Sequence, residues 1–472
     1  MDRLTPLAAM FLEAEDVDEH ASLAIGSLAV FEGPTPDFEE FVRTIEGRLP
    51  LIPRYRQKVR RVVLDLAAPA WVDDPEFDVR RHVRRTALPA PGGRHEIDQF
   101  LSQAMTSRMD RNSPLWECWF CEGLADGRWA LLSKIHHSMV DGVSGTDLYR
   151  LILDPTRSPR EPVPDDWRPA VPASALTFTA VALLEAASSL QIARAVTAAL
   201  GAPRRSARTA MASTRGLWKF TSAIRPVHAT SLMGTLDGSR RYAWTQVSIA
   251  DIRAVRTAHD VTFNDVALAA VTGGFRRLLE HRGETPDAHA LRSLVPVSMR
   301  APGEESIPDN RVSLMLPYLP VDVADPVERL KTVHRRIREL QASHEPEAGS
   351  SLTSLASLGP FAAVSEGIRL GLRLPQRHVA TVTTNVPGPR MPLYALGREL
   401  KELLPYVPIA DRVRIGVAII SYRDTLTFGL TGDYETARDL DVLADAIAES
   451  MRELVDEARA RAGSTGSRPS TA

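Results

Sequence analysis

The segment KIHHSMVDGVSG, residues 134–145, joins two stretches of different hydrophobic periodicity. The apolar run 129–137 that leads into it is typical of a β-strand, whereas apolar residues recur at helical spacing from Ser144 onward. A strand therefore passes into a helix through a short loop, which predicts an α/β fold. Because α/β proteins build their sites at the carboxyl ends of strands, we expect the functional site in this loop.

The loop carries side chains suited to acid–base chemistry. His136 and His137 are neighbours at the end of the strand, so their side chains should point to opposite faces and only one can face a cleft. A neutral imidazole is the natural general base near pH 7. Asp141 follows across a turn that contains Gly142, where its carboxylate would brace the loop or orient the ring. Without a serine or cysteine in a nucleophile elbow, the base is expected to act directly on a substrate hydroxyl.

Two other interpretations of the histidines were weighed. A metal site is disfavoured because neighbouring strand residues diverge and the spacing is not the His-x-x-x-His of a helix. We therefore expect no metal in the site and no bound zinc. The second alternative, a buried histidine bonded to backbone, is favoured for His136 and is less favoured than chemistry for His137.

The rest of the N-terminal part alternates strands and helices. Residues 22–31 alternate as a strand, and Thr35 is placed to cap the amphipathic helix that follows. The run 116–123 is predicted to pair with the strand before the histidines through the hairpin turn Asp126-Gly127. In the second half, the pattern predicts a helix over 264–281, a second helix that starts at residue 325, and a last amphipathic helix that includes residues 443–454. It also predicts strands over 291–299 and 379–386 and a hairpin of 413–420 with 425–430.

A proline-rich segment, residues 155–172, reads as a linker between the two halves. The predicted organisation is an N-terminal domain 1–154, a linker 155–238, a C-terminal domain 239–460 and a disordered tail 461–472. Within the linker, residues 174–200 form a long apolar helix that is too polar to span a bilayer. It would cover another domain, which we favour, or lie on a membrane surface.

Cys118 and Cys121 have the spacing of a redox Cys-x-x-Cys motif. They lie inside a predicted strand rather than at a helix N-terminus, and residues three apart on a strand face opposite sides. We therefore interpret them as buried packing thiols.

Composition excludes several classes of protein. The 472 residues are 44% hydrophobic and 25% charged, and two cysteines cannot support a disulfide scaffold. A formal net charge of -2 gives no basic field for nucleic acid, so no nucleic-acid partner is expected. The N-terminal residues lack the apolar run of a signal peptide, and no stretch reaches the roughly 18 apolar residues of a membrane span. A cytoplasmic protein with at most peripheral membrane contact is expected.

HHSMVDG, residues 136–142, fits the HHxxxDG motif of the CoA-dependent acyltransferase superfamily, which includes chloramphenicol acetyltransferase and peptide-synthetase condensation domains. The flanking segments resemble the bacterial wax ester synthase/diacylglycerol acyltransferase family, and most of all its actinobacterial triacylglycerol synthases. Ala9 departs from that family's pattern, where many members have an acidic residue. The resemblance runs from TPLAAMFLEAED at 5–16 to about residue 455. The segments that carry it are PRYRQKV at 53–59, WVDDPEFDVRRHV at 71–83, PLWE at 114–117, FNDVALA at 263–269, NRVSLMLPYLP at 310–320 and TNVPGP at 384–389.

The resemblance implies an α/β fold of two chloramphenicol acetyltransferase-like domains with mixed sheets and the active site at their interface. It also implies the transfer of an acyl group from acyl-CoA, a co-substrate, to a lipid hydroxyl, with no cofactor. His137 would be the general base, His136 would support the site, Asp141 would hold the loop and Gly142 would permit the turn.

Four further residues lie in the family's other motifs. Asn264 and Asp265 are candidates for substrate binding, yet Asn264 also suits an ordinary helix N-cap with Asp265 in the first turn, and both alternatives stay open. Thr384 and Asn385 are also candidate substrate-binding residues, but a turn role before Pro-Gly-Pro is favoured for them.

The leading functional prediction is a diacylglycerol O-acyltransferase that makes triacylglycerol. Alternatives are a wax ester synthase that uses a long-chain alcohol, an enzyme that acylates a polyketide or glycopeptide lipid, and a non-catalytic coat protein of lipid droplets. The expected partners are acyl-CoA and diacylglycerol or a long-chain alcohol, with peripheral contact to a membrane or lipid droplet. The sequence leaves acceptor preference, acyl chain length and oligomeric state undetermined.

Overall fold

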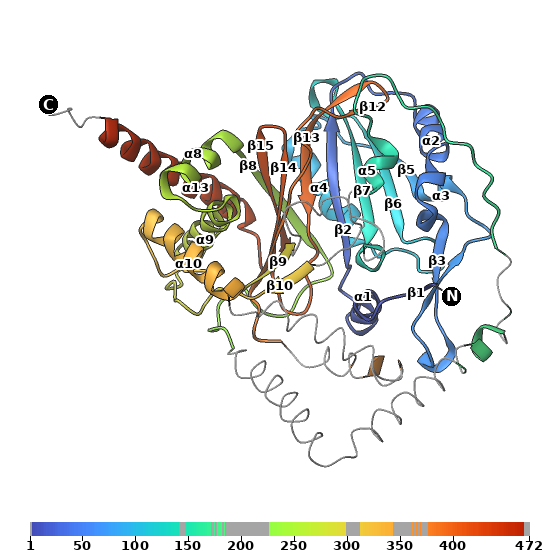
Figure 1. Cartoon of the computed structure of the whole chain (residues 1–472), viewed down its shortest axis with the longest axis horizontal. Coiled ribbons are helices and arrows are strands. Elements are labelled where there is room, and N and C mark those ends of the chain that lie inside the picture. Colours follow the sequence, from blue (N-terminus) through green and yellow to red (C-terminus); the bar gives the residue numbers. More distant parts are fainter. Residues whose placement is uncertain are drawn as a thin grey trace, which may run out of the picture.

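The computed structural model describes residues 2–140, 147–170, 226–298, 312–342 and 376–466, with 174, 177–181, 184, 361, 365–366 and 369. The chain forms two halves that lie side by side, each built around a six-stranded sheet (Figure 1). Both sheets are mixed and both carry helices, which confirms the predicted α/β fold class.

The N-terminal sheet has the strand order β12-β13-β2-β7-β6-β5. Only β5 and β6 run parallel; the other neighbours are antiparallel. Its strands are β2 (Ala24–Phe31), β5 (Val83–Ala87), β6 (Trp116–Glu122), β7 (Trp129–His136), β12 (Tyr394–Ala395) and β13 (Arg398–Tyr406). Between β6 and β7, Asp126 and Gly127 have φ of 61° and 67°, the left-handed pair of a tight hairpin turn, as the sequence predicts.

The C-terminal sheet has the order β10-β9-β11-β14-β15-β8. The neighbours β9, β11 and β14 run parallel, and the remaining pairs are antiparallel. Its strands are β8 (Arg240–Ser248), β9 (Ser293–Ser298), β10 (Val312–Met315), β11 (Thr381–Val386), β14 (Ile415–Tyr422) and β15 (Thr425–Asp433). The predicted strands and the predicted hairpin of this half are all present.

Two strands cross from the second half of the chain into the N-terminal sheet. β13 pairs antiparallel with β2, with Leu404 opposite Leu28. It also contacts β14 and β15 of the other sheet, and Tyr242 on β8 donates a hydrogen bond of 2.9 Å to the Pro405 carbonyl. Residues 394–406 belong to the predicted C-terminal domain by position in the sequence, but in space they complete the N-terminal sheet and join the two halves.

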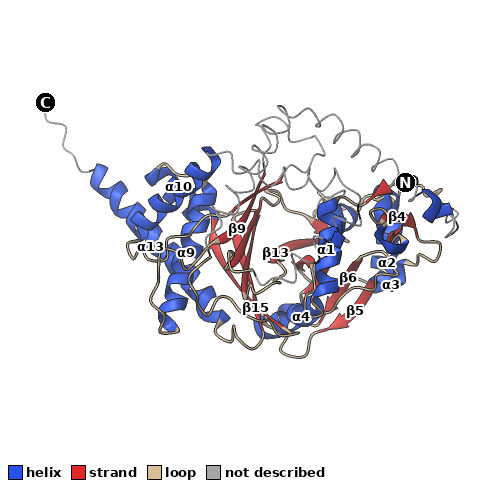
Figure 2. Ribbon diagram, turned by 90° about the horizontal axis from the view of Figure 1, so that it is seen from below, coloured by secondary structure: helices blue, strands red, loops and turns tan. Residues whose placement is uncertain are grey.

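Helices pack against both sheets. Figure 2 shows α9, α10 and α13 grouped beside the C-terminal sheet and α1 beside the N-terminal half, while α4 contacts strands of both sheets, β2 and β8. The helices are α1 (Pro6–Val17), α2 (Phe38–Glu46), α3 (Val79–His82), α4 (Arg94–Thr106), α5 (Asp147–Ile152), α8 (Ile249–His259), α9 (Phe263–His281), α10 (Pro326–Ala342) and α13 (Leu440–Gly466). A small antiparallel sheet completes the N-terminal half, formed by β1 (Asp2–Arg3), β4 (Ala70–Asp73) and β3 (Gln57–Arg60).

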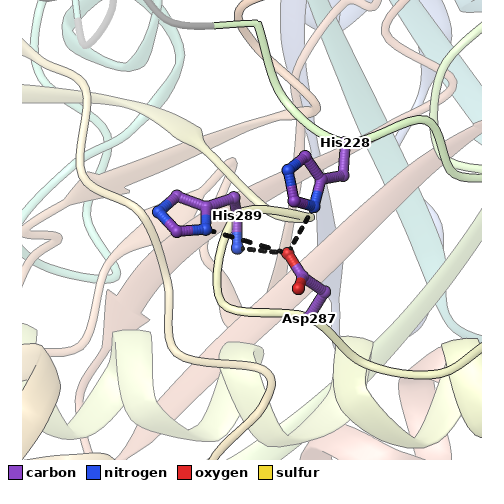
Figure 3. Close-up of side chains that lie close together, drawn as sticks. All are labelled: His228, Asp287 and His289. Atoms are coloured by element: carbon purple, nitrogen blue, oxygen red, sulfur yellow. Dashed lines mark hydrogen bonds and ion pairs between the residues drawn. The ribbon is translucent and has the colours of Figure 1, made fainter.

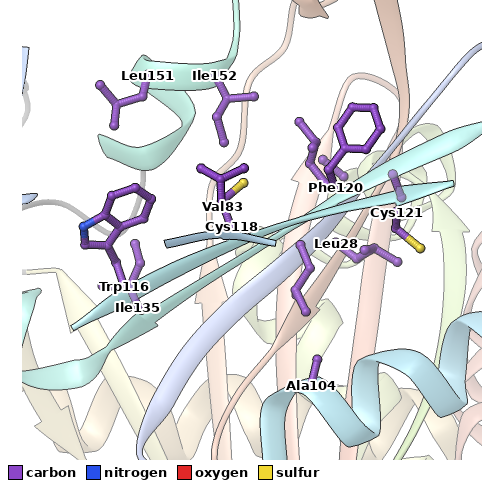
Figure 4. Packing of buried hydrophobic residues seen from close by; sticks show 14 of the residues in the cluster. Leu28, Val83, Ala104, Trp116, Cys118, Phe120, Cys121, Ile135, Leu151 and Ile152 are labelled. Atoms are coloured by element: carbon purple, nitrogen blue, oxygen red, sulfur yellow. The ribbon is translucent and has the colours of Figure 1, made fainter. Parts of the chain in front are cut away.

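The core of the N-terminal half packs large side chains of β6 and β7 against α2, α4 and α5 (Figure 4). Trp116 and Phe120 are fully buried there. Cys118 and Cys121 lie in the same core as free thiols, and burial raises the pKa of Cys121 to about 12. Their interpretation as packing residues is confirmed, because a buried thiol with a raised pKa carries almost no reactive thiolate.

Two local expectations are wrong. Asp37, not Thr35, caps α2. It directly precedes Phe38, the first residue of the helix, and its carboxylate accepts a hydrogen bond of 2.9 Å from the Glu40 amide. The predicted tail begins too early, because α13 continues through Gly466.

Within the described part of the chain, no helix is long and apolar enough to cross a membrane. The predicted long helix at 174–200 lies almost wholly outside the described residues.

Candidate active site

β7 ends at His136, and the chain then turns through a 3-10 helix, η5 (His137–Met139). The backbone holds this turn from both sides. The His136 amide donates to the Leu115 carbonyl and the His137 amide to the Leu23 carbonyl, each at 3.0 Å. The predicted position of the histidines, at the carboxyl end of a strand, is confirmed.

His136 is buried, with 1% of its surface exposed. Its Nδ1 accepts a hydrogen bond of 3.1 Å from the Ser138 amide and lies 2.7 Å from the Ser138 hydroxyl. An Nδ1 that accepts from an N–H leaves the ring proton on Nε2. Nε2 lies 3.3 Å from Oε1 of Glu15, so this proton faces a carboxylate. His136 is therefore a buried histidine bonded to the backbone, which is one of the two interpretations given for it from the sequence.

Glu15 is a buried carboxylate on α1 that the sequence analysis did not identify. It accepts hydrogen bonds from the Leu23 amide at 2.6 Å and from Arg111 at 3.0 Å, in addition to its contact with His136. Burial alone would raise the pKa of Glu15, but the contacts with His136, Leu23 and Arg111 outweigh it and lower the pKa to about 2. The available signal was the group of acidic residues Glu13, Glu15 and Asp16 that follows the apolar first half of this helix.

His137 is half-buried and its ring stacks on Phe11 of α1, with ring centroids 3.9 Å apart and an angle of 21° between the planes. Thus His136 and His137 differ as predicted: one is enclosed and the other is partly accessible. α1 contacts both, His136 through Glu15 and His137 through Phe11. Asp141 and Gly142 lie outside the described residues, so their roles stay predictions.

Asn264 and Asn385 meet although they lie 121 positions apart in the sequence. The Asn385 side-chain amide donates a hydrogen bond of 3.0 Å to Oδ1 of Asn264. Asn264 is not the N-cap of α9, because Thr262 occupies that position. The cap expectation for Asn264 is therefore wrong, and its side chain bonds across to β11 instead.

Asp265 is buried and completes a capping box with Thr262. Its Oδ2 accepts a hydrogen bond of 2.9 Å from the Thr262 amide, and the Thr262 hydroxyl accepts from the Asp265 amide at 3.2 Å. The same Oδ2 lies 2.7 Å from Nδ1 of His334 on α10. These contacts engage Oδ2 in helix capping and packing, while Oδ1 is buried without a hydrogen-bond partner.

Thr384 and Asn385 are half-buried residues of β11. They pair with Ala418 and Ile419 of β14, so the turn role favoured from the sequence is wrong for them. The strand ends at Val386, and beyond it the Gly388 amide donates a hydrogen bond of 2.9 Å to the Ser421 hydroxyl of β14. β11 is extended through Asn385 because its neighbour β14 continues to Tyr422.

Comparison with known proteins agrees with this architecture over nearly the whole chain. The family model "Wax ester synthase/diacylglycerol acyltransferase catalytic domain" matches residues 4–267, and "WS/DGAT C-terminal domain" matches residues 309–455. The Mycobacterium tuberculosis H37Rv protein named "Probable diacyglycerol O-acyltransferase tgs1" is 42% identical over 455 residues, which cover 96% of each chain.

Two solved structures are similar. The wax ester synthase/diacylglycerol acyltransferase from Marinobacter aquaeolei VT8 has a TM-score of 0.66 and 26% identity, over 97% of this chain and 99% of that one. The first condensation domain of the calcium-dependent antibiotic synthetase has a TM-score of 0.57 and 14% identity, with 97% of each chain covered. This second likeness concerns the fold alone, and agrees with the fold implied by the histidine motif.

Proposed function

Because the chain belongs to the wax ester synthase/diacylglycerol acyltransferase family, we propose that it is an acyl-CoA-dependent diacylglycerol O-acyltransferase. It transfers a long-chain acyl group from acyl-CoA to the hydroxyl of diacylglycerol and produces triacylglycerol and free CoA. The observation that carries the proposal is the match of a full-length relative named for this activity, together with the accessible His137 at the end of β7.

In the proposed mechanism, His137 acts as the general base. Its imidazole takes the proton of the acceptor hydroxyl while the oxygen attacks the thioester carbonyl. The new C–O bond forms, the C–S bond breaks, and the CoA thiolate leaves with the proton that the imidazolium returns. No acyl-enzyme and no cofactor are needed. Positioned proton transfer contributes about 10²–10⁴-fold, so alignment of the two substrates and stabilisation of the oxyanion supply the remainder.

Glu15 and His136 are proposed as positioning residues for this base. His136 precedes His137 directly, and its ring is held between Glu15 and Ser138. A buried imidazole that is hydrogen-bonded at Nδ1 and faces the Glu15 carboxylate at Nε2 restricts the backbone of the turn that presents His137. Phe11 restricts the His137 ring itself by stacking on one of its faces. The base is therefore held before substrate binds, which lowers the entropy cost of reaching the reactive geometry.

The paired amides of Asn264 and Asn385 are proposed as part of the substrate site. Both side chains are partly exposed, and each limits the rotation of the other through their hydrogen bond. One N–H of the Asn385 amide is used in this bond, and the second can donate to a substrate oxygen. Thr384 and Gly142 remain substrate-binding candidates, and Asp141 remains the candidate that holds the loop.

A water-insoluble acceptor must be taken from a lipid surface, so the proposal includes peripheral contact of this cytoplasmic enzyme with a membrane or lipid droplet. A wax ester synthase is the second candidate, because the family name covers both acceptors. A non-catalytic coat protein is disfavoured, since a coat needs neither His137 nor the buried contacts around it.

The test is CoA release by purified protein given palmitoyl-CoA and either dioleoylglycerol or hexadecanol, with products separated by chromatography. Triacylglycerol should form faster than wax ester. His137→Ala should abolish ester formation, and His95→Ala, a change of an exposed histidine on α4, should not. A His137→Ala enzyme within a few-fold of wild type would exclude the base assignment. Faster wax ester formation would favour the second candidate.

A further inference from the structure

Three side chains that can bind a metal ion gather on the surface of the C-terminal half (Figure 3). His228 lies near the end of the predicted linker, before β8, whereas Asp287 and His289 belong to the connection between α9 and β9. Their side chains are 62%, 45% and 53% exposed. None of these elements carries the histidine turn proposed for catalysis.

The ligand atoms converge on a small volume. Nδ1 of His228 lies 2.7 Å and Nδ1 of His289 lies 3.9 Å from the same atom, Oδ1 of Asp287. In a tetrahedral zinc site with bonds of about 2.0–2.1 Å, ligand atoms are roughly 3.3 Å apart. The two observed distances fall on either side of that value. Small rotations of exposed side chains would therefore bring all three atoms into the geometry of such a site.

Main-chain hydrogen bonds, and one bond to the Asp287 carboxylate, hold the three residues in place. The His228 amide donates a hydrogen bond of 3.1 Å to the His289 carbonyl, and the neighbouring Val227 amide donates one of 2.8 Å to Arg377. Asp287 forms a turn in which its Oδ1 accepts from the His289 amide at 2.8 Å. The imidazoles are thus brought to one side of the carboxylate by the main chain.

Within the cluster, Nδ1 of His289 makes no hydrogen bond to the carboxylate of Asp287. At 3.9 Å, Nδ1 of His289 is too far from Oδ1 of Asp287 for a hydrogen bond, while that oxygen already accepts from two groups. A cation placed between the three would use both ring nitrogens and the carboxylate at once. Two imidazoles and one carboxylate form a ligand set typical of zinc, with a fourth position left for water.

We propose that His228, Asp287 and His289 form a surface site for a divalent cation of the zinc class. The spacing of the adjacent histidines 136 and 137 predicts no zinc there. The local sequence does not reveal the present site, because His228 and Asp287 are 59 positions apart in the sequence and no local spacing links them.

The expected role of the ion is structural. It would tie the end of the linker to the connection between α9 and β9. Since the three ligands converge only in the folded protein, zinc should raise the melting temperature. This inference is independent of the proposed reaction, because no residue of the site is assigned to catalysis.

In the experiment, full-length protein freed of metal with a chelator is titrated with zinc chloride in a calorimeter. The zinc that stays bound after dialysis is then measured by metal analysis. We expect one zinc per chain in the wild type and in the control His95→Ala. Loss of a group that only supports a metal ligand lowers metal affinity roughly 10–100-fold. Loss of a direct ligand should cost at least as much, so His289→Ala should bind zinc at least about 100-fold more weakly. Asp287→Asn keeps an oxygen for the turn and should also bind more weakly.

Melting temperatures measured with and without zinc separate binding from folding. Each variant should melt like the wild type without metal and should lack the increase that zinc gives the wild type. Acyl transfer by His228→Ala should be unchanged. A wild type that takes up no zinc would overturn the site, and so would a His228→Ala/His289→Ala double variant that binds zinc as the wild type does.

Discussion

Replacing Glu15 by glutamine should destabilise the protein and reduce kcat together. The carboxylate is buried, with 2% of its surface exposed, and it contacts His136, Leu23 and Arg111. Glutamine has nearly the same shape and can still accept from the Leu23 amide. It removes the negative charge that faces Arg111 and His136, and it leaves both of these groups without their anionic partner.

The size of the effect follows from the pKa of Glu15. Burial opposes the ionised form, but hydrogen bonds from His136, Leu23 and Arg111 prevail and lower the pKa from 4.5 to about 2. This difference between the unfolded and folded values corresponds to about 3 kcal/mol of stability. Because the folded pKa is the lower one, the contribution is complete above pH 4.5 and is lost as the pH falls toward 2.

Urea unfolding at several pH values measures this contribution. At pH 7, Glu15→Gln should be about 3 kcal/mol less stable than the wild type, and the gap should narrow below pH 4.5. Glu19→Gln is the matched control, because Glu19 lies just beyond the end of α1 and its side chain is 88% exposed. This variant should have the stability of the wild type at every pH. Equal stability of wild type and Glu15→Gln at pH 7 would refute the assigned network.

Activity provides the second measurement. If Glu15 positions the turn through His136, its loss displaces His137 and should lower kcat by about 10–100-fold, with little change in KM. A variant that is destabilised but retains full kcat would show that Glu15 serves folding only. Assays run well below the melting temperature of the variant keep the two effects apart.

Three other outcomes are expected. Phe11→Leu should lower kcat while stability falls by roughly 0.5–1.5 kcal/mol, because the ring that stacks on His137 is lost; unchanged activity in the ester assay would exclude a role for the stack. Asn385→Ala removes the bond to Asn264 and should raise KM more than it changes the unfolding midpoint, and identical Michaelis curves would contradict its substrate role. A thiol reagent at pH 8 should label neither Cys118 nor Cys121 until urea is added, since burial raises the pKa of each thiol, and rapid labelling of the folded protein would show that the core opens.

The local pattern of the sequence was enough to predict most of the elements. The strand before His136, the hairpin at Asp126-Gly127 and the helix that begins at Pro326 were predicted from periodicity and turn chemistry. Such signals are short-range, so a single segment carries them. Errors occurred where two neighbours could play the same role: Asp37 replaced Thr35 as a cap, and Thr262 replaced Asn264.

The contacts that build the candidate site are long-range. Glu15 meets His136 across 121 positions, and Asn264 meets Asn385 across the same number. Neither pair has a spacing that secondary structure would reveal, because packing of one element on another brings them together. The sequence alone determined the α/β class, the place of the histidines at a strand end and the family. Only the tertiary structure decided that His136 is enclosed, that Glu15 is its partner and that β13 joins the two halves, since each depends on which surfaces are buried against one another.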